Sequence, residues 1–418
     1  DKIKRGHLEL SIWDFAGQQE YYNSHHYFLQ HRSIFLILWK MNEPKESNKG
    51  LAGISFWLKS LSNHLQSIES NENENQKGKS YSIIVVGTHL DDKNVKKDQQ
   101  SIQEREKEIK RIAKESGIKI PIEIKEISCV KMVEKMRELE ETIYKQALEH
   151  DYMGEKVPLT YLEVEKVIQE LLEKKVVSQD IPVVDVDEIV SETNKKITVS
   201  KELVQRSIKL LSEWGKCLYF DQSESLSNLV ILDPRFLTQD ILAQLFNINE
   251  EIKQYVKNGI IEHKNLKNIW NKFANKSNFD LLSKKLIEMM ENLEVCFVLE
   301  DKKKEFNEQR SLVPSLLFDE CPSIESLFKS NSGSIVEIQK NLKFNEIPQE
   351  MVSRLFVRLH SNMGEKFIWK NAIYFEKQED LKCLLIVDKQ YMKIKIRGEV
   401  ENICLGMADE IIDQIKQV

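Results

Sequence analysis

The sequence is poor in three things: paired cysteines, long apolar runs and an excess of positive charge. The six cysteines are scattered and include no C-x-x-C pair, so they indicate free thiols in a reducing compartment and no zinc site. No run of eighteen apolar residues occurs, which excludes an integral membrane helix. The 61 basic and 67 acidic residues leave a net charge of -6, so the basic footprint of a nucleic-acid-binding protein is missing.

The length and composition indicate more than one domain. With 418 residues, of which 41% are hydrophobic and 31% charged, the chain can bury two or three cores of ordinary size. The opening residues Asp1–Arg5 do not form a signal peptide. We therefore expect a cytoplasmic protein, although recruitment to a membrane by a partner would leave no mark on the sequence.

The most informative stretch is Leu8–Glu20. Apolar and polar residues alternate over 8–12, which predicts a strand that stops where Asp14 and Gly17 begin. Ligands of α/β sheets bind beyond the carboxyl ends of strands. There, Asp14 can reach Mg²⁺ through water, the N–H of Gly17 can approach a terminal phosphate, and Gln18 can orient an attacking water. This D-x-x-G-Q pattern is typical of Ras-like GTPases, whereas its structural alternative is a strand followed by a tight turn.

Two later stretches agree with the nucleotide interpretation. The apolar residues 82–86 predict a strand leading to Asp91, whose carboxylate can accept hydrogen bonds from N1 and N2 of guanine. Residues 122–127 predict another strand, which ends at Ser128. With a strand at 33–39 and helices at 54–68, 98–116 and 133–150, the order is that of repeated βαβ units in a parallel sheet. We expect the strand at 8–12 to contribute to that sheet.

The phosphate-binding pattern G-x-x-x-x-G-K-[ST] is missing from these residues. Either the chain is a fragment without the upstream half of a GTPase domain, or the protein is a degenerate GTPase. We favour the fragment because the remaining motifs are intact.

The middle of the chain predicts a winged-helix-like module after a boundary near residues 151–158. Helices are expected at 159–176, 185–193 and 200–213, with Ser200 as a cap, followed by a hairpin of strands at 217–220 and 229–232. The helix at 201–214 has few basic residues, which disfavours DNA binding.

The last part predicts a small α+β module with an antiparallel sheet. A helical run is expected from Gly259, then a helix at 281–290 and strands at 297–299 and 311–316. After a Ser-rich link at 323–334 we expect five short strands and a closing helix; the strands are 356–359, 367–369, 372–375, 383–387 and 392–396, and the helix is 407–418.

The motifs together resemble one family. Trp13–Glu20 (WDFAGQQE) and Val86–Asp91 (VGTHLD) resemble Roc, the Ras-of-complex GTPase domain of the Roco family. The segment from Trp214 to Leu237 resembles COR, the C-terminal-of-Roc module that follows Roc, and so do the stretches 312–317 and 354–359. The resemblance implies a Roc part at 1–150 without its P-loop half, a COR N-terminal subdomain at 158–322 and a COR C-terminal subdomain at 334–418.

The resemblance also implies roles. Asp14 would lie near Mg²⁺, Gly17 would sense the γ-phosphate of GTP, and Gln18 would position water for hydrolysis. Thr88, His89 and Asp91 would hold the guanine base of GTP or GDP, with His89 in place of the family's usual lysine, and Ser128 would lie in the last base-contacting loop.

Beyond the site, the resemblance implies a regulatory GTPase unit that forms a homodimer through COR. Leucine-rich repeats and a serine/threonine kinase domain would belong to the parent chain, outside these residues. Without the phosphate-binding loop, the chain as it stands should bind nucleotide poorly. The alternative is a degenerate G domain that serves as a dimerisation scaffold without hydrolysing GTP.

Overall fold

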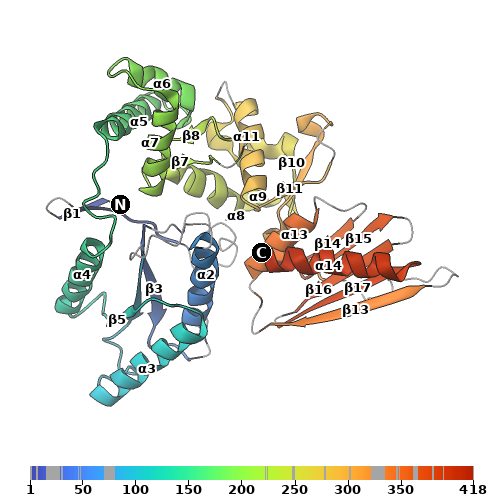
Figure 1. The fold of residues 1–418 in the computed structure, drawn as a ribbon, viewed down its shortest axis with the longest axis horizontal. Coiled ribbons are helices and arrows are strands. Elements are labelled where there is room, and N and C mark those ends of the chain that lie inside the picture. The colour runs from blue at the N-terminus through green and yellow to red at the C-terminus, as the bar shows by residue number, and fades with distance from the viewer. Residues whose placement is uncertain are drawn as a thin grey trace. The chain divides into compact units, whose positions relative to one another are not determined.

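The structure is a computed structural model of residues 1–418 (Figure 1). Close contacts divide the chain into two units, one formed by Asp1–His25 with Leu159–Val418 and the other by His26–Pro158. The residues that the structure describes are 2–5, 8–15, 29, 32–45, 47, 49–69, 81–221, 223, 225–246, 250–276, 279–300, 303–321, 335–344, 347, 349–360, 366–378, 381–388 and 390–417.

A parallel sheet forms the centre of the unit His26–Pro158. Its strands β3 (Ile34–Lys40), β4 (Ser82–Thr88) and β5 (Ile122–Glu126) lie in the order β3-β4-β5. All seven residues of β4 are buried, because this strand lies between two neighbours and is covered on both faces. The predicted parallel α/β arrangement of these three strands is confirmed.

Three helices cover this sheet: α2 (Leu51–Glu69), α3 (Gln99–Glu115) and α4 (Val133–Leu148). Figure 1 shows α2 and α4 on opposite sides of the strands. Leu139 of α4 packs on Ile84 and Val86 of β4. Helix α3 begins after Asp98, whose carboxylate accepts a hydrogen bond from the N–H of Ser101 at 2.9 Å.

The opening strand differs from the prediction in its pairing. Strand β2 (Leu8–Ser11) forms as expected, but among the described residues it pairs antiparallel with β1 (Lys2–Arg5) in a two-stranded sheet of its own. The predicted membership of the parallel sheet is therefore wrong. The alternating exposure of β2 explains this, because a strand covered on one face suits a hairpin better than a sheet interior.

Three helices and a small sheet follow. The helices are α5 (Leu159–Val177), α6 (Val186–Asn194) and α7 (Lys201–Glu213), and the strands are β6 (Val183–Asp185), β7 (Leu218–Tyr219) and β8 (Leu229–Ile231). The hydroxyl of Ser200 caps α7 by accepting from the N–H of Leu203. The strand order β6-β8-β7 confirms the predicted hairpin and adds one strand to it.

The next segment is built from short elements around helix α11 (Phe279–Asn292). Strands β9 (Val256–Lys257), β10 (Ile260–Glu262), β11 (Phe297–Val298) and β12 (Arg310–Leu312) form one antiparallel sheet. The helical elements around them are η3 (Phe236–Leu242), α8 (Ala243–Phe246), α9 (Glu250–Lys253), η4 (His263–Asn265), α10 (Leu266–Ile269), η5 (Asn271–Phe273), η6 (Phe306–Glu308) and η7 (Pro314–Leu316).

Two details of this segment correct the sequence prediction. Gly259 does not introduce a helix directly. Its φ of +73° makes the turn between β9 and β10, and the first helical element follows β10. Strand β12 ends at Leu312, and η7 occupies the rest of the predicted strand 311–316.

The last part contains a five-stranded antiparallel sheet in the order β13-β17-β16-β15-β14. Its elements are β13 (Val336–Lys343), α13 (Gln349–His360), β14 (Lys366–Trp369), β15 (Ala372–Gln378), β16 (Leu381–Val387), β17 (Tyr391–Gly398) and α14 (Glu401–Gln417). The predicted strand at 356–359 is wrong, because these residues belong to α13. The predicted antiparallel α+β module is confirmed.

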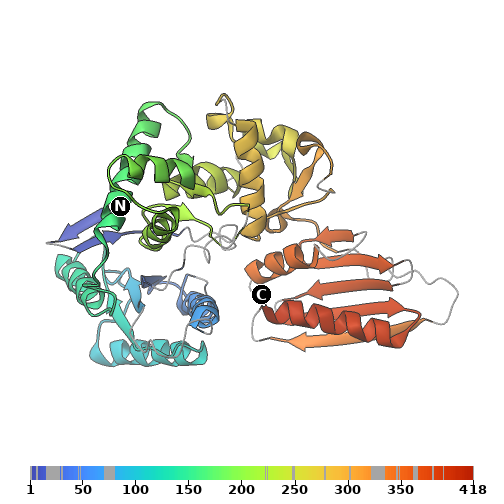
Figure 2. The same cartoon turned by 45° about the horizontal axis from the view of Figure 1, so that its top comes forward.

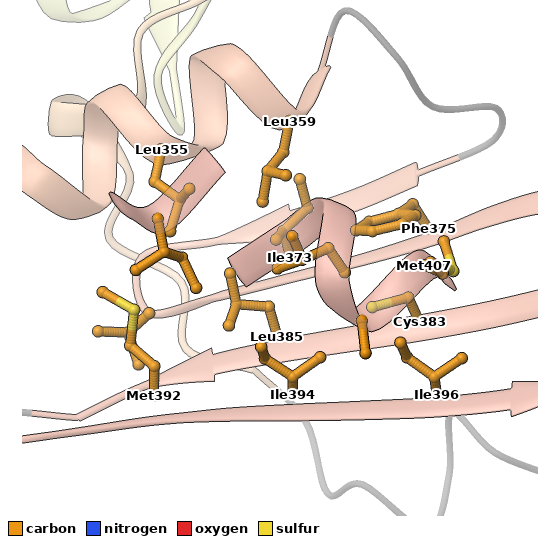
Figure 3. Packing of buried hydrophobic residues seen from close by; sticks show 14 of the residues in the cluster. Leu355, Leu359, Ile373, Phe375, Cys383, Leu385, Met392, Ile394, Ile396 and Met407 are labelled. Atoms are coloured by element: carbon orange, nitrogen blue, oxygen red, sulfur yellow. The ribbon is translucent and has the colours of Figure 1, made fainter. Parts of the chain in front are cut away.

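Helices α13 and α14 lie on the same face of this sheet (Figure 2). Figure 3 shows Leu355 and Leu359 of α13 directed toward Ile373 and Leu385 of the strands, and these four side chains are fully buried. This cluster is the largest core of the C-terminal part.

No helix within the described part of the chain is both long and apolar enough to cross a lipid bilayer. All six cysteines are free thiols, as the sequence predicted.

Candidate functional site

The carboxyl ends of β4 and β5 bring Asp91 and Ser128 together. The hydroxyl of Ser128 donates a hydrogen bond to Oδ1 of Asp91 at 2.7 Å, although 37 residues separate the two along the chain. The backbone continues the pairing of the strands up to this point, because the N–H of Leu90 donates to the carbonyl of Ile127 at 3.0 Å. Parallel strands thus place both side chains at one edge of the sheet, as expected from the sequence.

The turn after β5 fixes the orientation of Ser128. Its Oγ accepts hydrogen bonds from the N–H groups of Lys131 at 2.9 Å and Val130 at 3.3 Å, and the side chain is buried. With its lone pairs engaged, the hydroxyl hydrogen is directed to Asp91. This hydrogen bond lowers the pKa of the Asp91 carboxyl below its ordinary value, so Asp91 is a carboxylate at neutral pH.

Thr88 and His89 lie one and two residues beyond Gly87 at the end of β4. The hydroxyl of Thr88 is 3.0 Å from the carbonyl oxygen of Trp39 and 2.9 Å from Nδ1 of His89. Thr88 is buried, and its hydrogen bond to Trp39 joins the ends of β3 and β4. His89 is exposed and has a φ of 65°, a left-handed conformation that turns the backbone toward Asp91.

Two supports of this edge were missed from the sequence. Arg105 of α3 forms a two-point ion pair with Glu126, with Nε–Oε1 at 2.7 Å and Nη2–Oε2 at 2.8 Å, and both side chains are largely buried. The side chain of Asn42, after β3, donates to Asp92 at 2.9 Å. In the expected helix 98–116, one arginine among many charged residues gave no signal of its buried partner.

The predicted residues of the D-x-x-G-Q motif belong to the other unit of the chain. Asp14 is exposed and follows β2 in the unit that contains Asp1–His25. Gly17 and Gln18 lie outside the described residues. Among the residues that the structure does describe, no group of three or more His, Cys, Asp or Glu side chains could hold a metal ion. The roles assigned to Asp14, Gly17 and Gln18 remain predictions.

Two family models match the chain in sequence order. The model described as "Ras of Complex, Roc, domain of DAPkinase" matches residues 1–91, and the model described as "C-terminal of Roc, COR-A domain" matches residues 158–317.

Two curated proteins of Dictyostelium discoideum are similar over nearly the whole chain. A probable serine/threonine-protein kinase, pats1, is 30% identical over 99% of this chain, and a cyclic GMP-binding protein C is 23% identical over 97%. The chain spans only 12% and 15% of their lengths.

A solved structure, described as Methanosarcina barkeri Roco2 RocCORdC bound to GDP, is also similar. Its TM-score is 0.49 at 16% identity, with 76% of this chain and 83% of that chain covered. The two matched family models and the aligned kinase define the family: the chain belongs to the Roco family and carries a Roc module followed by a COR module.

Proposed function

We propose that this chain is a regulatory unit that binds guanine nucleotides and that Asp91 selects the base. The observation that carries the proposal is the 2.7 Å hydrogen bond from Ser128 to Asp91 at the ends of two adjacent parallel strands. It holds a carboxylate in a defined orientation at the sheet edge where ligands of α/β proteins bind.

The chemistry of the carboxylate suits guanine. Guanine presents two donors side by side, N1–H and the 2-amino group, and a carboxylate can accept one hydrogen bond on each oxygen. Adenine has no donor at N1, so it cannot form the same pair. Oδ1 of Asp91 keeps capacity for guanine because a carboxylate oxygen accepts about two hydrogen bonds, and Ser128 provides only one.

The neighbouring residues have different proposed roles. The exposed imidazole of His89 would pack on one face of the base, where the family usually has a lysine. Thr88 would act indirectly, because its buried hydroxyl holds the end of β4 against Trp39. Ser128 would position Asp91.

GTP hydrolysis is proposed from the resemblance of Asp14–Gln18 to the family motif. Asp14 would hold a water molecule bound to Mg²⁺, the N–H of Gly17 would meet the γ-phosphate, and the amide of Gln18 would orient the attacking water. Bound Mg²⁺ would neutralise phosphate charge in the transition state.

Saturation-transfer NMR with millimolar GDP, ADP and XDP tests base selection even when binding is weak. The wild-type chain should give a signal from GDP and little from ADP. Xanthine carries a carbonyl oxygen in place of the 2-amino group of guanine, so Asp91→Asn should lose the GDP signal and gain one from XDP. Asp151→Asn removes the same charge at an exposed position of the same unit and is the matched control.

Equal signals from GDP and ADP in the wild type, or unchanged selectivity in Asp91→Asn, would contradict the proposed role of Asp91. A chain without any guanine preference would leave the dimerisation scaffold as the alternative.

We also propose that the modules run from 1–150, 158–322 and 334–418 and that the COR part forms a homodimer. The C-terminal sheet supports dimerisation, because its outer strand β14 presents Phe367 with 52% of its surface exposed. A strictly monomeric species in light scattering at high micromolar concentration would contradict this.

Control of a kinase domain is proposed from the relatives that are named as kinases. In a longer protein that contains this chain and a kinase domain, Asp91→Asn should change the kinase activity, whereas Asp151→Asn should not.

A further inference from the structure

The hairpin β1–β2 is tied to the turn that follows α7. The ammonium group of Lys216 lies 3.0 Å from Oε1 of Glu9, on β2, and 2.9 Å from Oε1 of Glu165, on α5. Only 19% of the Lys216 side chain is exposed, so these ion pairs are better shielded from water than ordinary surface pairs. Burial opposes the charge of Lys216, but its hydrogen bonds to Glu165 and Glu9 outweigh this effect and raise its pKa.

A second contact lies beside the first. Gly215 has a φ of +67°, and a Cβ atom built on it would lie 2.9 Å from Nε1 of Trp13 and 3.0 Å from Oγ of Ser11. Real side chains do not approach so closely, so Trp13 occupies space that is available only because residue 215 is a glycine.

These contacts join residues of the two matched modules. All of them lie within the unit formed by Asp1–His25 and Leu159–Val418. Glu9 and Trp13 fall in the stretch matched by the Roc model, whereas Glu165, Gly215 and Lys216 fall in the stretch matched by the COR-A model. Trp13 immediately precedes Asp14, and Glu9 lies five residues before it. The contacts therefore lie at both ends of the segment that leads into the D-x-x-G motif.

We propose that the turn Trp214–Lys216 is the docking site for the strand that leads into D-x-x-G, and that Lys216 is a positioning residue for Asp14. The COR module then sets where this motif lies. The inference adds a means of regulation to the proposed nucleotide site, and its relevance to nucleotide rests on that proposed function, but the docking itself does not.

The charges give Lys216 a role beyond simple attraction. Without the ammonium group, Glu9 and Glu165 would face each other as two carboxylates sharing one partly shielded space. Like charges at such a distance repel, so removing Lys216 replaces two attractions with one repulsion. We expect the hairpin to detach while the rest of the module stays folded.

Hydrogen exchange of the 418-residue chain, followed by mass spectrometry, tests the docking. Lys216→Met should accelerate exchange in residues 8–14 about tenfold and leave β16 and β17 unchanged, because a tenfold change corresponds to the loss of about one charge-assisted hydrogen bond. Lys216→Arg keeps the charge and should remain close to wild type. Lys196→Met removes a lysine whose ion pair with Glu170 is more exposed, and it serves as the control.

A glycine substitution tests the second contact independently. Asparagine tolerates a positive φ, so Gly215→Asn introduces the clash with Trp13 at little backbone cost. Exchange in residues 8–14 should again accelerate. Gly154→Asn is the matched control, because Gly154 has a φ of +82° and a Cβ atom built on it would have no neighbouring atom within 4 Å.

Unchanged exchange in residues 8–14 of Lys216→Met and Gly215→Asn would overturn the docking proposal, and so would equal acceleration in the two controls. Neither measurement involves nucleotide. A failure to bind GDP would therefore refute the proposed function without affecting this result.

Discussion

Strands β2 and β4 both lie in the stretch that matches the Roc model, yet they have opposite surroundings. Strand β4 is buried along its whole length between β3 and β5. Strand β2 alternates between partly buried and exposed residues and pairs with β1 alone among the described strands. Glu9 of β2 pairs with Lys216 and Ser11 of β2 lies against Gly215, and both partners fall in the stretch matched by the COR-A model.

The difference suits the two proposed functions of the module. The end of β4 is held by backbone pairing and by buried side chains, and such a rigid edge suits the proposed recognition of a base. The segment after β2 is held by side-chain contacts that can form and break, which suits a motif whose position is to be regulated.

The largest expected effect comes from replacing one apolar residue of each strand by alanine. Ile84→Ala in β4 should reduce the free energy of unfolding of its unit by about 2–5 kcal/mol, because Ile84 is fully buried and its loss leaves a cavity. Leu10→Ala in β2 should cost less than about 1 kcal/mol, because Leu10 is only partly buried. Urea unfolding followed by hydrogen exchange of each strand measures both. Equal costs would show that β2 is as firmly packed as β4.

Acid offers a way to weaken the unit that contains the hairpin. His263 is buried between Phe306 and Ser311, and burial lowers its pKa from 6.5 to about 4. The unfolded chain therefore binds a proton near pH 6.5 that the folded chain does not bind until about pH 4, so stability falls as the pH drops through this window.

The size of this effect follows from the two pKa values. Between pH 7 and pH 5 the loss should be about 2 kcal/mol. His263→Gln should abolish that part of the pH dependence, as measured by urea unfolding at both pH values. An identical pH dependence in the variant would show that His263 is not the group responsible.

The ion pair between Arg105 and Glu126 gives the next effect in size. Arg105→Gln leaves the largely buried Glu126 without its two-point partner and should destabilise this unit by about 1–3 kcal/mol. Arg111→Gln removes exposed ion pairs with Glu108 and Glu115 on the same helix and should leave the free energy of unfolding almost unchanged. Thermal unfolding of the two variants compares them directly. If Arg111→Gln is the more harmful, the edge does not depend on α3 in this way.

The sequence predicted most helices and strands because their apolar periods are long. Helix α13 was one of the exceptions. Its buried residues Val352, Leu355, Phe356 and Leu359 have helical spacing, but the four-residue window 356–359 is too short to distinguish a helix from a strand. Strand β13 was missed because it is an edge strand with mostly exposed residues, and Lys340 interrupts the alternation of Val336, Ile338 and Leu342 with polar residues.

The site was predictable where it depends on residues at strand ends, as with Asp91 and Ser128. The Arg105–Glu126 pair and the contact of Lys216 with Glu9 were not predictable, because charged residues form a pattern only when both partners are placed in space. The same reason explains why the strand at 8–12 was identified but its neighbours were not.

The smallest expected effect concerns the hydrogen bond from Ser128 to Asp91. Ser128→Ala should leave the fold intact but weaken GDP binding about fivefold, because the loss of one hydrogen bond is worth about 1 kcal/mol. It should also raise the pKa of Asp91, since the Ser128 hydroxyl is the main group that lowers it. Guanine binding needs the carboxylate, so the acid limit of binding should move to higher pH in the variant.

NMR titration of GDP from about pH 7 down to about pH 2.5 measures this shift of the acid limit. Ser101→Ala is the matched control, because it removes a serine hydroxyl that likewise donates to an aspartate, Asp98, but at the start of α3. An unchanged acid limit in Ser128→Ala would mean that Ser128 does not position Asp91. The edge of β4 would then be no more organised for recognition than the segment that follows β2.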